Sequence, residues 1–304
     1  MITDILIIGA GPAGITAAVY AARAGFRVAV VEKNIYGGQT SIIENIENYP
    51  GFVKISGSDF AQVLYEQATN LGVKFVFGEA VDVNFENELN ETVISDGEKI
   101  LSRAVIIANG LKRRILGCTG EKEFSGRGVS YCATCDGAFF KGKSVIVVGG
   151  GNTALEDALY LSGICQKVTM IVRKKEFRGE KILVDTVKKT SNIEIMFESV
   201  IKEIKGEKTV ECAVIRSEDT DEVLPVEGVF IAIGYQPCNE MYRGKIDMTD
   251  GGYFDCSEDC RTNVEGVFVA GDCRIKPLRQ IATAVGDGAV AGNAAANFIR
   301  RAIQ

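Results

Sequence analysis

The chain has 304 residues, of which 46% are hydrophobic and 24% charged, and its formal net charge is −6. This length suits two domains of a soluble globular protein, and the acidic balance argues against nucleic acid or an anionic membrane surface as a partner. No apolar run approaches the ~18 residues of a membrane-spanning helix, and the absence of histidine excludes Ser-His-Asp hydrolysis and every other mechanism that needs an imidazole.

The first elements along the chain predict a dinucleotide-binding unit. Residues 4–8 form an apolar strand, residues 9–14 read Gly-Ala-Gly-Pro-Ala-Gly, residues 15–24 form an Ala-rich helix, and residues 27–31 form a second strand that ends at Glu32. The glycines allow a tight turn and the close approach of a pyrophosphate, and the acid accepts hydrogen bonds from ribose hydroxyls. No signal-peptide pattern precedes this unit, so we expect a cytoplasmic protein.

Further elements follow this unit up to residue 110. The pattern predicts a helix over residues 58–71 and an apolar strand over 104–108 that leads into Asn109 and Gly110. Between them, we expect a small antiparallel meander of strands at 73–77, 81–85 and 92–95.

A cysteine pair follows, in which Cys132 and Cys135 are separated by two residues and Asp136 comes at once. Cysteines at this spacing can close a small disulfide ring and pass two electrons, and a stabilised thiolate is a nucleophile near neutral pH. The spacing also serves zinc, which prefers four Cys or His ligands. Because the chain has no His, and its other close pair of Cys256 and Cys260 is more loosely spaced, we favour a redox pair over a metal site or two idle thiols.

A second dinucleotide unit begins after this pair. It has a strand at 144–148, the turn Gly-Gly-Gly-Asn-Thr-Ala at 149–154, a helix at 155–161 and a strand at 168–172. At the distance where the first unit has Glu32, this unit has Val172, and four basic residues follow: Arg173, Lys174, Lys175 and Arg178. An acid would repel a 2′-phosphate and basic groups attract it, so the first unit suits FAD or NAD and the second suits NADPH. A solvated basic turn is the alternative.

The remaining pattern is a helix at 180–189, strands at 193–197, 210–215 and 227–233, a strand over 267–272 that ends in Asp272, and an Ala-rich helix at 281–301 whose first half is weakened by glycines. No low-complexity linker separates two domains, which fits one domain inserted into the other.

These motifs together resemble those of the bacterial-type, low-molecular-weight thioredoxin reductases. The shared motifs are residues 9–14, Gly37-Gly38-Gln39, the Cys132-Ala-Thr-Cys135-Asp136 stretch, residues 149–154, and Gly271-Asp272 followed by Arg279-Gln280. The resemblance implies an α/β fold with two Rossmann-like, three-layer nucleotide-binding domains. The FAD domain would comprise residues 1–112 and 242–304, and the inserted NADPH domain residues 113–241. It also implies a homodimer that reduces thioredoxin.

The resemblance further implies roles for individual residues. FAD contacts would come from Gly9, Gly11, Pro12, Ala13, Gly14, Glu32, Lys33, Gly38, Gln39, Asn48, Gly271, Asp272, Arg279, Gln280 and Ile281. NADPH contacts would come from Gly149, Gly151, Asn152, Thr153, Arg173, Lys174 and Arg178. Cys135 would face the flavin, and Cys132 would attack the disulfide of thioredoxin. Asp136 would supply a proton, although an acid at a helix start can also be only a cap. No resident metal is expected.

The chain departs from the usual family pattern at two functional motifs. The usual His-Arg-Arg of the coenzyme site is Val172-Arg173-Lys174 here, and the usual Ala-Thr-Gly is Ala108-Asn109-Gly110. Rival interpretations are a relative that takes electrons from NADH or ferredoxin, a dithiol oxidase that passes electrons to oxygen, and a nucleotide-sensing protein without turnover.

Overall fold

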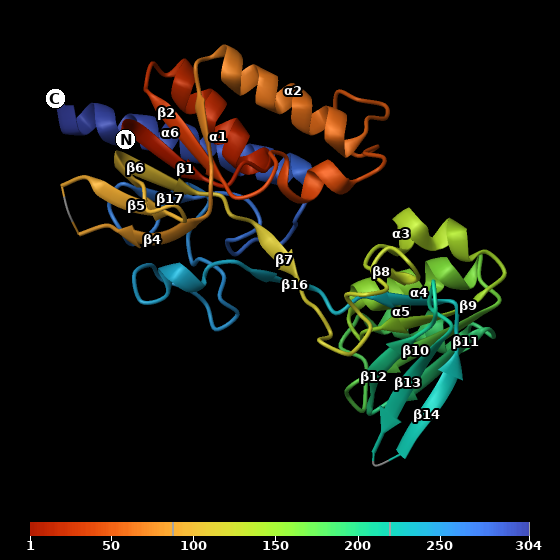
Figure 1. Cartoon of the computed structure of the whole chain (residues 1–304). Coiled ribbons are helices and arrows are strands. Elements are labelled where there is room, and N and C mark those ends of the chain that lie inside the picture. The colour runs from red at the N-terminus through yellow and green to blue at the C-terminus, as the bar shows by residue number, and fades with distance from the viewer. Residues whose placement is uncertain (87, 219, 304) are drawn as a thin grey trace. The chain divides into compact units, whose positions relative to one another are not determined.

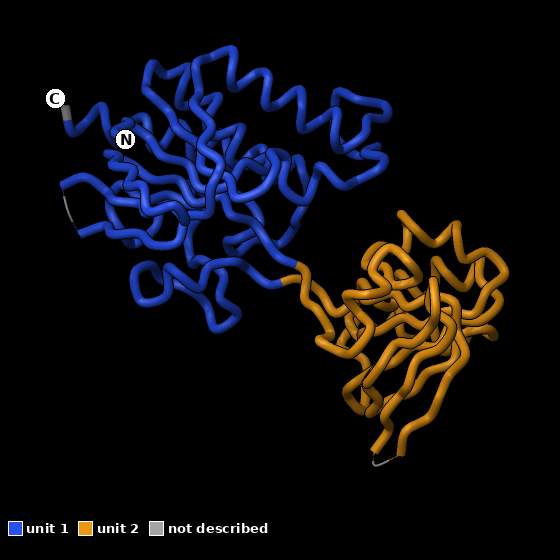
Figure 2. Tube along the Cα trace, viewed as in Figure 1, with its two compact units in different colours: residues 1–112, 236–304 blue, residues 113–235 orange. Residues whose placement is uncertain are grey.

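The computed structural model describes residues 1–86, 88–218 and 220–303, and the chain divides into two compact units (Figures 1 and 2). Unit 1 comprises Met1–Lys112 and Gln236–Gln304, and unit 2 comprises Arg113–Tyr235. The predicted return to the first domain lay after residue 241, slightly later than in the structure. Residues just after 235 lie with unit 1 because Asn239 donates hydrogen bonds to the carbonyls of Gly252 and Cys273.

Unit 1 is built on a sheet whose order is β3-β2-β1-β6-β5-β4, with β17 also paired to β6. The strands are β1 (Ile2–Ile8), β2 (Val28–Glu32), β3 (Lys74–Phe77), β4 (Ala80–Asn84), β5 (Asn90–Ile94), β6 (Lys99–Ile107) and β17 (Val267–Val269). The pairs among β3, β2, β1, β6 and β17 are parallel, and β4 and β5 are antiparallel. The predicted meander was therefore wrong for β3, which joins the parallel sheet beside β2.

Side chains alternate between the two faces of this sheet. Ile5 and Ile7 lie in the core beneath the helices, and Leu6 and Ile8 lie in the core of the opposite face. Because every second residue points to the same side, a strand that is apolar throughout must be covered on both faces. Unit 1 is thus three-layered, as expected.

The helices of unit 1 are α1 (Pro12–Arg23), α2 (Gly57–Asn70), α6 (Ile281–Ile303) and the short η1 (Gly38–Ile42) and η3 (Glu240–Tyr242). Figure 1 shows α1 and α6 side by side on one face of the sheet. Helix α6 is continuous despite its glycines. A Cβ on Gly288 would stand 2.2 Å from the carbonyl oxygen of Ala13, so this glycine lets the two helices pack closely.

Unit 2 repeats the parallel arrangement in the order β11-β10-β9-β15-β8. Its strands are β8 (Val129–Ser130), β9 (Ser144–Val148), β10 (Lys167–Val172), β11 (Ile193–Phe197) and β15 (Gly228–Ile231), and its helices are α3 (Ala133–Asp136), η2 (Gly137–Phe140), α4 (Asn152–Ser162) and α5 (Lys181–Lys189). The helices cover one face, and residues of the antiparallel strands β12 (Ser199–Lys205) and β13 (Cys212–Ser217) pack on the other; β14 (Thr220–Pro225) pairs with β13.

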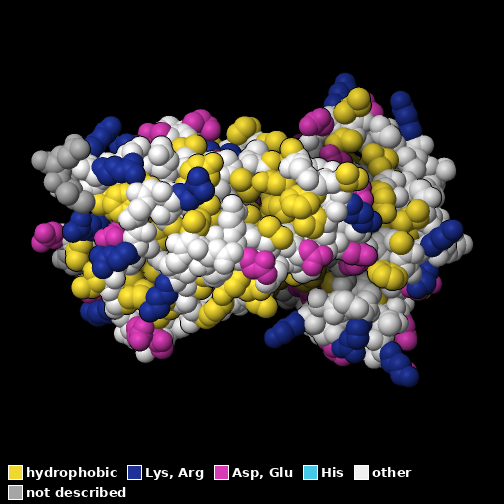
Figure 3. Space-filling view, turned by 90° about the horizontal axis from the view of Figure 1, so that it is seen from above, with side chains coloured by type: hydrophobic (Ala, Val, Ile, Leu, Met, Phe, Trp, Pro, Cys, Tyr) yellow, Lys and Arg dark blue, Asp and Glu magenta, His cyan; other side chains and the backbone are white. Residues whose placement is uncertain are grey.

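The chain passes between the units at β7 (Leu111–Arg113) and β16 (Tyr235–Pro237), which pair with each other. On the face of the molecule in Figure 3, basic and acidic side chains are interspersed, and no region of that face carries one sign of charge alone. Within the described residues, no helix is both long and apolar enough to cross a membrane.

Candidate active site

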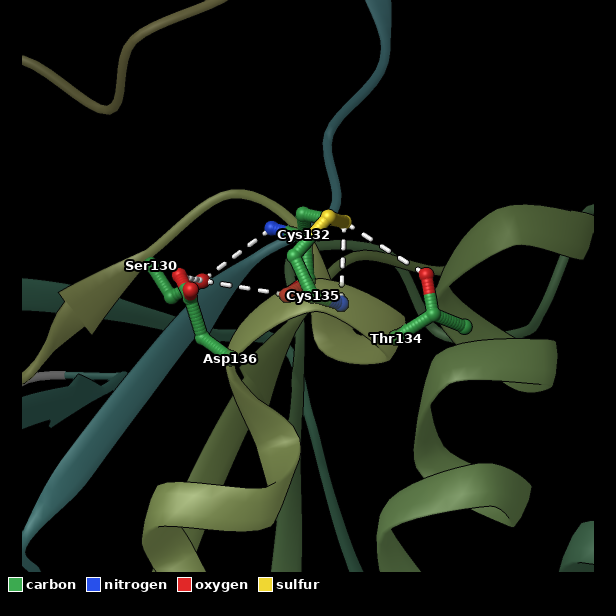
Figure 4. Close-up of a disulfide and its surroundings, with 5 residues drawn as sticks. All are labelled: Ser130, Cys132, Thr134, Cys135 and Asp136. Atoms are coloured by element: carbon green, nitrogen blue, oxygen red, sulfur yellow. Dashed lines mark hydrogen bonds between the residues drawn. A yellow bond between two sulfur atoms is a disulfide. The ribbon is translucent and has the colours of Figure 1, made fainter. Parts of the chain in front are cut away.

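The cysteine pair of unit 2 forms a disulfide at the start of a short helix (Figure 4). Cys132 follows β8 and is the N-cap of α3, and Cys135 lies on that helix. The Sγ atom of Cys132 accepts a hydrogen bond from the amide of Cys135 at 3.2 Å and lies 3.5 Å from the Thr134 hydroxyl. Hydrogen-bond donors at sulfur stabilise a thiolate over a thiol. The amide of Cys135 is a donor of this kind, directed at Cys132 Sγ.

The Asp136 carboxylate, directly after the cysteine pair in the sequence, is turned toward Ser130 (Figure 4). The Ser130 hydroxyl donates to Asp136 Oδ2 at 2.6 Å. Ser130 Oγ in turn accepts a hydrogen bond from the amide of Cys132 at 3.1 Å. Asp136 lies in the first turn of α3 and at the N-cap position of η2, but its carboxylate makes no capping hydrogen bond to η2. Sequence reasoning missed Ser130, although a hydroxyl residue two positions before the cysteine pair was a usable signal.

Tyr131, directly before the pair, belongs to a second group that the sequence analysis did not identify. Its hydroxyl donates to Glu121 Oε1 at 3.0 Å, and Arg113 lies over its ring at 5.4 Å. Glu121 is buried and also accepts the amide of Gly117. Burial and the bond to Glu121 raise the pKa of Tyr131 to about 12, so its phenol stays protonated at neutral pH. This group anchors the strand that presents Cys132.

The glycine turn of unit 1 has the shape expected for a dinucleotide. Gly9 has φ of +105°, and a Cβ there would stand 2.4 Å from the carbonyl oxygen of Ala108. A Cβ on Gly11, by contrast, would meet nothing within 4 Å. The glycine at position 11 is therefore not required by the packing of the protein itself, and it leaves open space at the start of α1 that a pyrophosphate can use.

Glu32 lies at the end of β2 beside this turn. Its Oε2 accepts the amide of Ala10 at 2.8 Å, and its Oε1 accepts the amide of Asn34 at 2.9 Å. Each carboxylate oxygen can accept a further bond, so Glu32 can hold the turn and still bind ribose hydroxyls. The neighbouring Lys33 is exposed and lies 3.6 Å from Glu79, which places its charge on the surface.

Further predicted FAD contacts come together from distant parts of unit 1. Asn48 donates to Gln280 at 3.0 Å across 232 residues of sequence. Arg279 lies over the ring of Tyr253 at 4.5 Å and donates to the carbonyl of Asp272. Ile281 is the first residue of α6, and Gly38 is the first of η1, where a Cβ would lie 3.3 Å from the Cα of Gly11.

Asp272 carries a buried oxygen, Oδ1, that has no hydrogen-bond partner among the described residues. Burial raises the pKa of Asp272, an effect that the charges of Lys276 and Arg279 only partly offset. A buried acceptor without a donor is costly, so a native structure is expected to supply one. Together with the open space at Gly11, this oxygen shows that the residues of unit 1 fit a dinucleotide with hydroxyl donors.

A buried ion cluster supports the turn before Asp272, and sequence reasoning missed it. Asp287 on α6 accepts two bonds from Arg274, each at 2.8 Å, one from Lys276 at 2.8 Å and one from the amide of Gly271 at 2.9 Å. Burial alone would raise the pKa of Asp287, but the bonds from Arg274 and Lys276 outweigh it and hold the pKa below its ordinary value. The cluster fixes Gly271, and with it the position of Asp272.

The glycine turn of unit 2 repeats these features. Gly149 has φ of +145° and would place a Cβ 2.4 Å from the carbonyl oxygen of Ala232, and a Cβ on Gly151 would meet nothing within 4 Å. Asn152, the first residue of α4, exchanges two hydrogen bonds with Glu180, at 2.8 and 2.9 Å. Thr153 follows Asn152 on the same helix. This turn also fits a dinucleotide, and its Asn152 is held by the segment that follows the basic residues.

The basic residues after β10 are exposed, whereas Val172 is buried in the core of unit 2. Lys175 lies 3.7 Å from Glu198. Among the described residues, no ion pair involves Arg173, Lys174 or Arg178. The amide of Arg178 donates to the carbonyl of Gly150 at 2.7 Å, so the basic segment is tied to the glycine turn. Three cations without acidic partners therefore lie near the predicted coenzyme turn.

The other cysteines are free thiols, and in the part of the chain that the structure describes no group of three or more possible ligands is arranged to hold a metal ion. Cys273 is fully buried, and its thiol donates to the carbonyl of Ala270 at 3.3 Å. Burial raises the pKa of Cys273 to about 12. It is a buried thiol that stays protonated at neutral pH.

Comparison with known proteins places this chain among well-described relatives. The profile of the family described as pyridine nucleotide-disulphide oxidoreductase matches residues 3–288. A thioredoxin reductase of Listeria monocytogenes is 41% identical over 301 residues, which cover 98% of this chain and 94% of that protein. The structure of thioredoxin reductase from Streptococcus pyogenes matches with a TM-score of 0.80 at 39% identity and covers 99% of both chains. A ferredoxin-flavin thioredoxin reductase from Clostridium acetobutylicum matches with a TM-score of 0.55 at 31% identity, again over 99% of both.

Proposed function

This chain belongs to the pyridine nucleotide-disulphide oxidoreductase family and, within it, to the thioredoxin reductases, and on this basis we propose that it reduces the disulfide of a thioredoxin with electrons from NADPH. The observation that carries the proposal is the disulfide between Cys132 and Cys135, which lies in a chain with two dinucleotide turns. FAD bound to unit 1 supplies the two-electron chemistry that links a nicotinamide to a disulfide.

Once reduced, the two cysteines of unit 2 carry out a disulfide exchange. The Cys132 thiolate attacks one sulfur of the thioredoxin disulfide, which forms a mixed disulfide and releases one thioredoxin thiolate. The Cys135 thiolate then attacks Cys132 Sγ, releases the second thioredoxin sulfur and restores the Cys132–Cys135 bond. The amide of Cys135 that already donates to Cys132 Sγ supports this order, because it favours Cys132 as the attacking thiolate.

Asp136 is the proposed proton donor and acceptor for this exchange. Two thiolates of thioredoxin must gain protons in each turnover, and no histidine is present to deliver them. The Ser130 hydroxyl donates to Asp136 at 2.6 Å and accepts the amide of Cys132, so one side chain links the carboxylate to the backbone of the cysteine pair, which supports this role. Ser130 is in this view a positioning residue.

The preference for NADPH rests on the segment after β10. Val172 removes the acid that would repel a 2′-phosphate, and Arg173, Lys174 and Arg178 are exposed without acidic partners among the described residues. Lys175, which lies near Glu198, is the basic residue of the segment that is least available. A phosphate bound here would gain charge-assisted hydrogen bonds in place of water.

A different electron donor is the second candidate function. Val172 and Lys174 depart from the usual His-Arg-Arg, and one relative of known structure is described as a ferredoxin-flavin thioredoxin reductase. A reductase of that kind would keep the disulfide chemistry of Cys132 and Cys135 and would not need the basic segment.

Anaerobic stopped-flow reduction of the purified yellow protein distinguishes these donors. We expect NADPH to bleach the flavin absorbance and support thioredoxin reduction, with NADH much less effective and reduced ferredoxin inactive. Bleaching by ferredoxin alone would favour the second candidate, and a protein that purifies without bound flavin would contradict both. A homodimer in the cytoplasm is the remaining part of the proposal, and sedimentation and cell fractionation test it.

A further inference from the structure

At the carboxyl edge of the unit 1 sheet, four neighbouring strands end in chemically different groups. In spatial order these are Glu32 after β2, the turn at Gly9 after β1, Asn109 after β6, and Asp272 after β17. Ligands of open parallel sheets bind along this edge. With the proposed FAD, Glu32 serves the adenosine ribose, the turn serves the pyrophosphate, and Asp272 lies on the flavin side. Asn109 therefore stands between the pyrophosphate and the flavin.

The orientation of the Asn109 amide is determined by its neighbours. Its Nδ2 donates to the carbonyl of Cys238 and to Asn239 Oδ1, the latter at 3.2 Å. Asn239 uses its own amide nitrogen for the carbonyls of Gly252 and Cys273, so its Oδ1 faces Asn109 as an acceptor. A flipped Asn109 would bring oxygen against oxygen at both contacts. Its Oδ1 consequently lies on the side away from residues 238 and 239.

This Oδ1 atom is buried and has no hydrogen-bond partner among the described residues, which is the condition also found at Asp272 Oδ1. The Cα of Asn109 lies 3.1 Å from the point where a Cβ on Gly9 would stand, so the residue adjoins the dinucleotide turn. A buried amide oxygen needs a donor. Phosphate oxygens cannot donate at neutral pH, whereas the hydroxyls of the ribityl chain, which joins the pyrophosphate to the flavin, can.

We propose that Asn109 Oδ1 accepts a hydrogen bond from a ribityl hydroxyl of bound FAD. This inference rests on the proposed function, because it requires FAD in unit 1. It gives a role to the departure from the usual Ala-Thr-Gly: the nitrogen of Asn109 binds residues 238 and 239, and its oxygen contacts the cofactor.

The test measures the affinity of the FAD-free protein for FAD and for three FAD analogues, each of which lacks one ribityl hydroxyl. Binding is monitored by the change in flavin fluorescence. Asn109→Leu removes the acceptor at similar volume. Ser102→Ala is the matched control, since Ser102 Oγ is another buried oxygen without a partner, on β6 but in the part of the strand that pairs with Thr3 and Asn90. We expect Asn109→Leu to weaken FAD binding by about three- to tenfold, and Ser102→Ala to change nothing.

The analogues separate a direct contact from a structural effect, as in a double-mutant cycle. If the contact exists, the unmodified protein binds one of the analogues more weakly than it binds FAD. The leucine variant and the unmodified protein then have equal affinities for that analogue. An equal loss for FAD and all three analogues, or no loss at all, overturns the inference. Should the leucine variant not fold, Asn109→Val, which also lacks an acceptor, takes its place with the same expectations. An unmodified protein that binds no FAD would instead refute the proposed function.

Discussion

Replacing Asp287 by Ala would leave the buried Lys276 without its countercharge among the described residues, and the buried Arg274 with only the exposed Glu258 at 3.4 Å. The side chains of Arg274 and Lys276 are only 2% and 4% exposed, and the Asp287 carboxylate is the acid that both contact at 2.8 Å. Removing one partner of a buried ion pair costs about 3–5 kcal/mol. For a unit of this size, such a loss lowers the melting temperature by about 6–20 °C.

Asp221→Ala is the matched control, because Asp221 also bridges an Arg and a Lys. It accepts from Arg216 at 2.6 Å and from Lys202 at 2.8 Å, but the cations are 44% and 50% exposed. Exposed ion pairs are screened by water and salt and contribute little. Thermal unfolding and urea titration of the two variants, both with flavin bound, should show a large loss for Asp287→Ala and almost none for Asp221→Ala.

The pH dependence gives a second measurement of the same cluster. The pKa of Asp287 is lowered in the folded protein by its bonds to Arg274 and Lys276. Its stabilising contribution is therefore fully present above the ~3.9 of an unfolded carboxyl and is lost as pH falls through the lower folded pKa. The stability gap between the unmodified protein and Asp287→Ala should be constant from neutral pH down to about 4 and narrow below it. Equal losses in the two variants at pH 7 would show that burial of the cluster has no energetic importance.

Three further predictions concern catalysis, coenzyme choice and packing. Cys132→Ser should abolish thioredoxin reduction in a coupled assay and leave flavin content unchanged, because a serine hydroxyl cannot form the mixed disulfide; retained activity would disprove the exchange. Replacing Arg173 and Arg178 by Ala should raise KM for NADPH about tenfold or more and leave NADH use unchanged, and the effect should shrink in high salt; equal effects on both coenzymes would contradict it. Gly288→Ala should lower the melting temperature because its Cβ would lie 2.2 Å from a backbone oxygen of α1. Gly286→Ala should raise the melting temperature, because its Cβ would meet no atom within 4 Å and Ala favours a helix over Gly. The opposite order of melting temperatures would refute the packing argument.

The two glycine turns and the strands around them were predictable because their determinants are local. The turn at Gly9 needs a positive φ, and the buried part of β1 is the apolar run of residues 5–8. Both features are visible within ten residues of sequence. The course of β3 was not predictable in this way. Its residues fit any half-buried strand, and its pairing with β2 depends on how α2 returns the chain to the sheet.

The residues of the candidate site also differ in how far they could be predicted, according to whether their determinants are local in the sequence. The Cys132–Cys135 pair is recognised by spacing, and Asp136 by adjacency. The cluster around Asp287 could not be seen, because a charged residue within an apolar helix says nothing about which distant cations it meets. Asn109 was visible only as a departure from a pattern, and its role depends on Asn239, 130 residues later in the chain.

The division of the sequence between the units also sets an order for folding during synthesis. Unit 2 is one continuous segment, so its sheet, disulfide site and glycine turn can form once residue 235 has left the ribosome. The folding of unit 1 is completed later, because its last two elements are synthesised at the end of the chain. These are β17, which pairs with β6, and α6, which covers α1. At ordinary rates of chain elongation this delay is on the order of ten seconds. During it, the apolar face of α1 has no α6 to cover it, and this is the interval in which a nascent chain would depend most on chaperones.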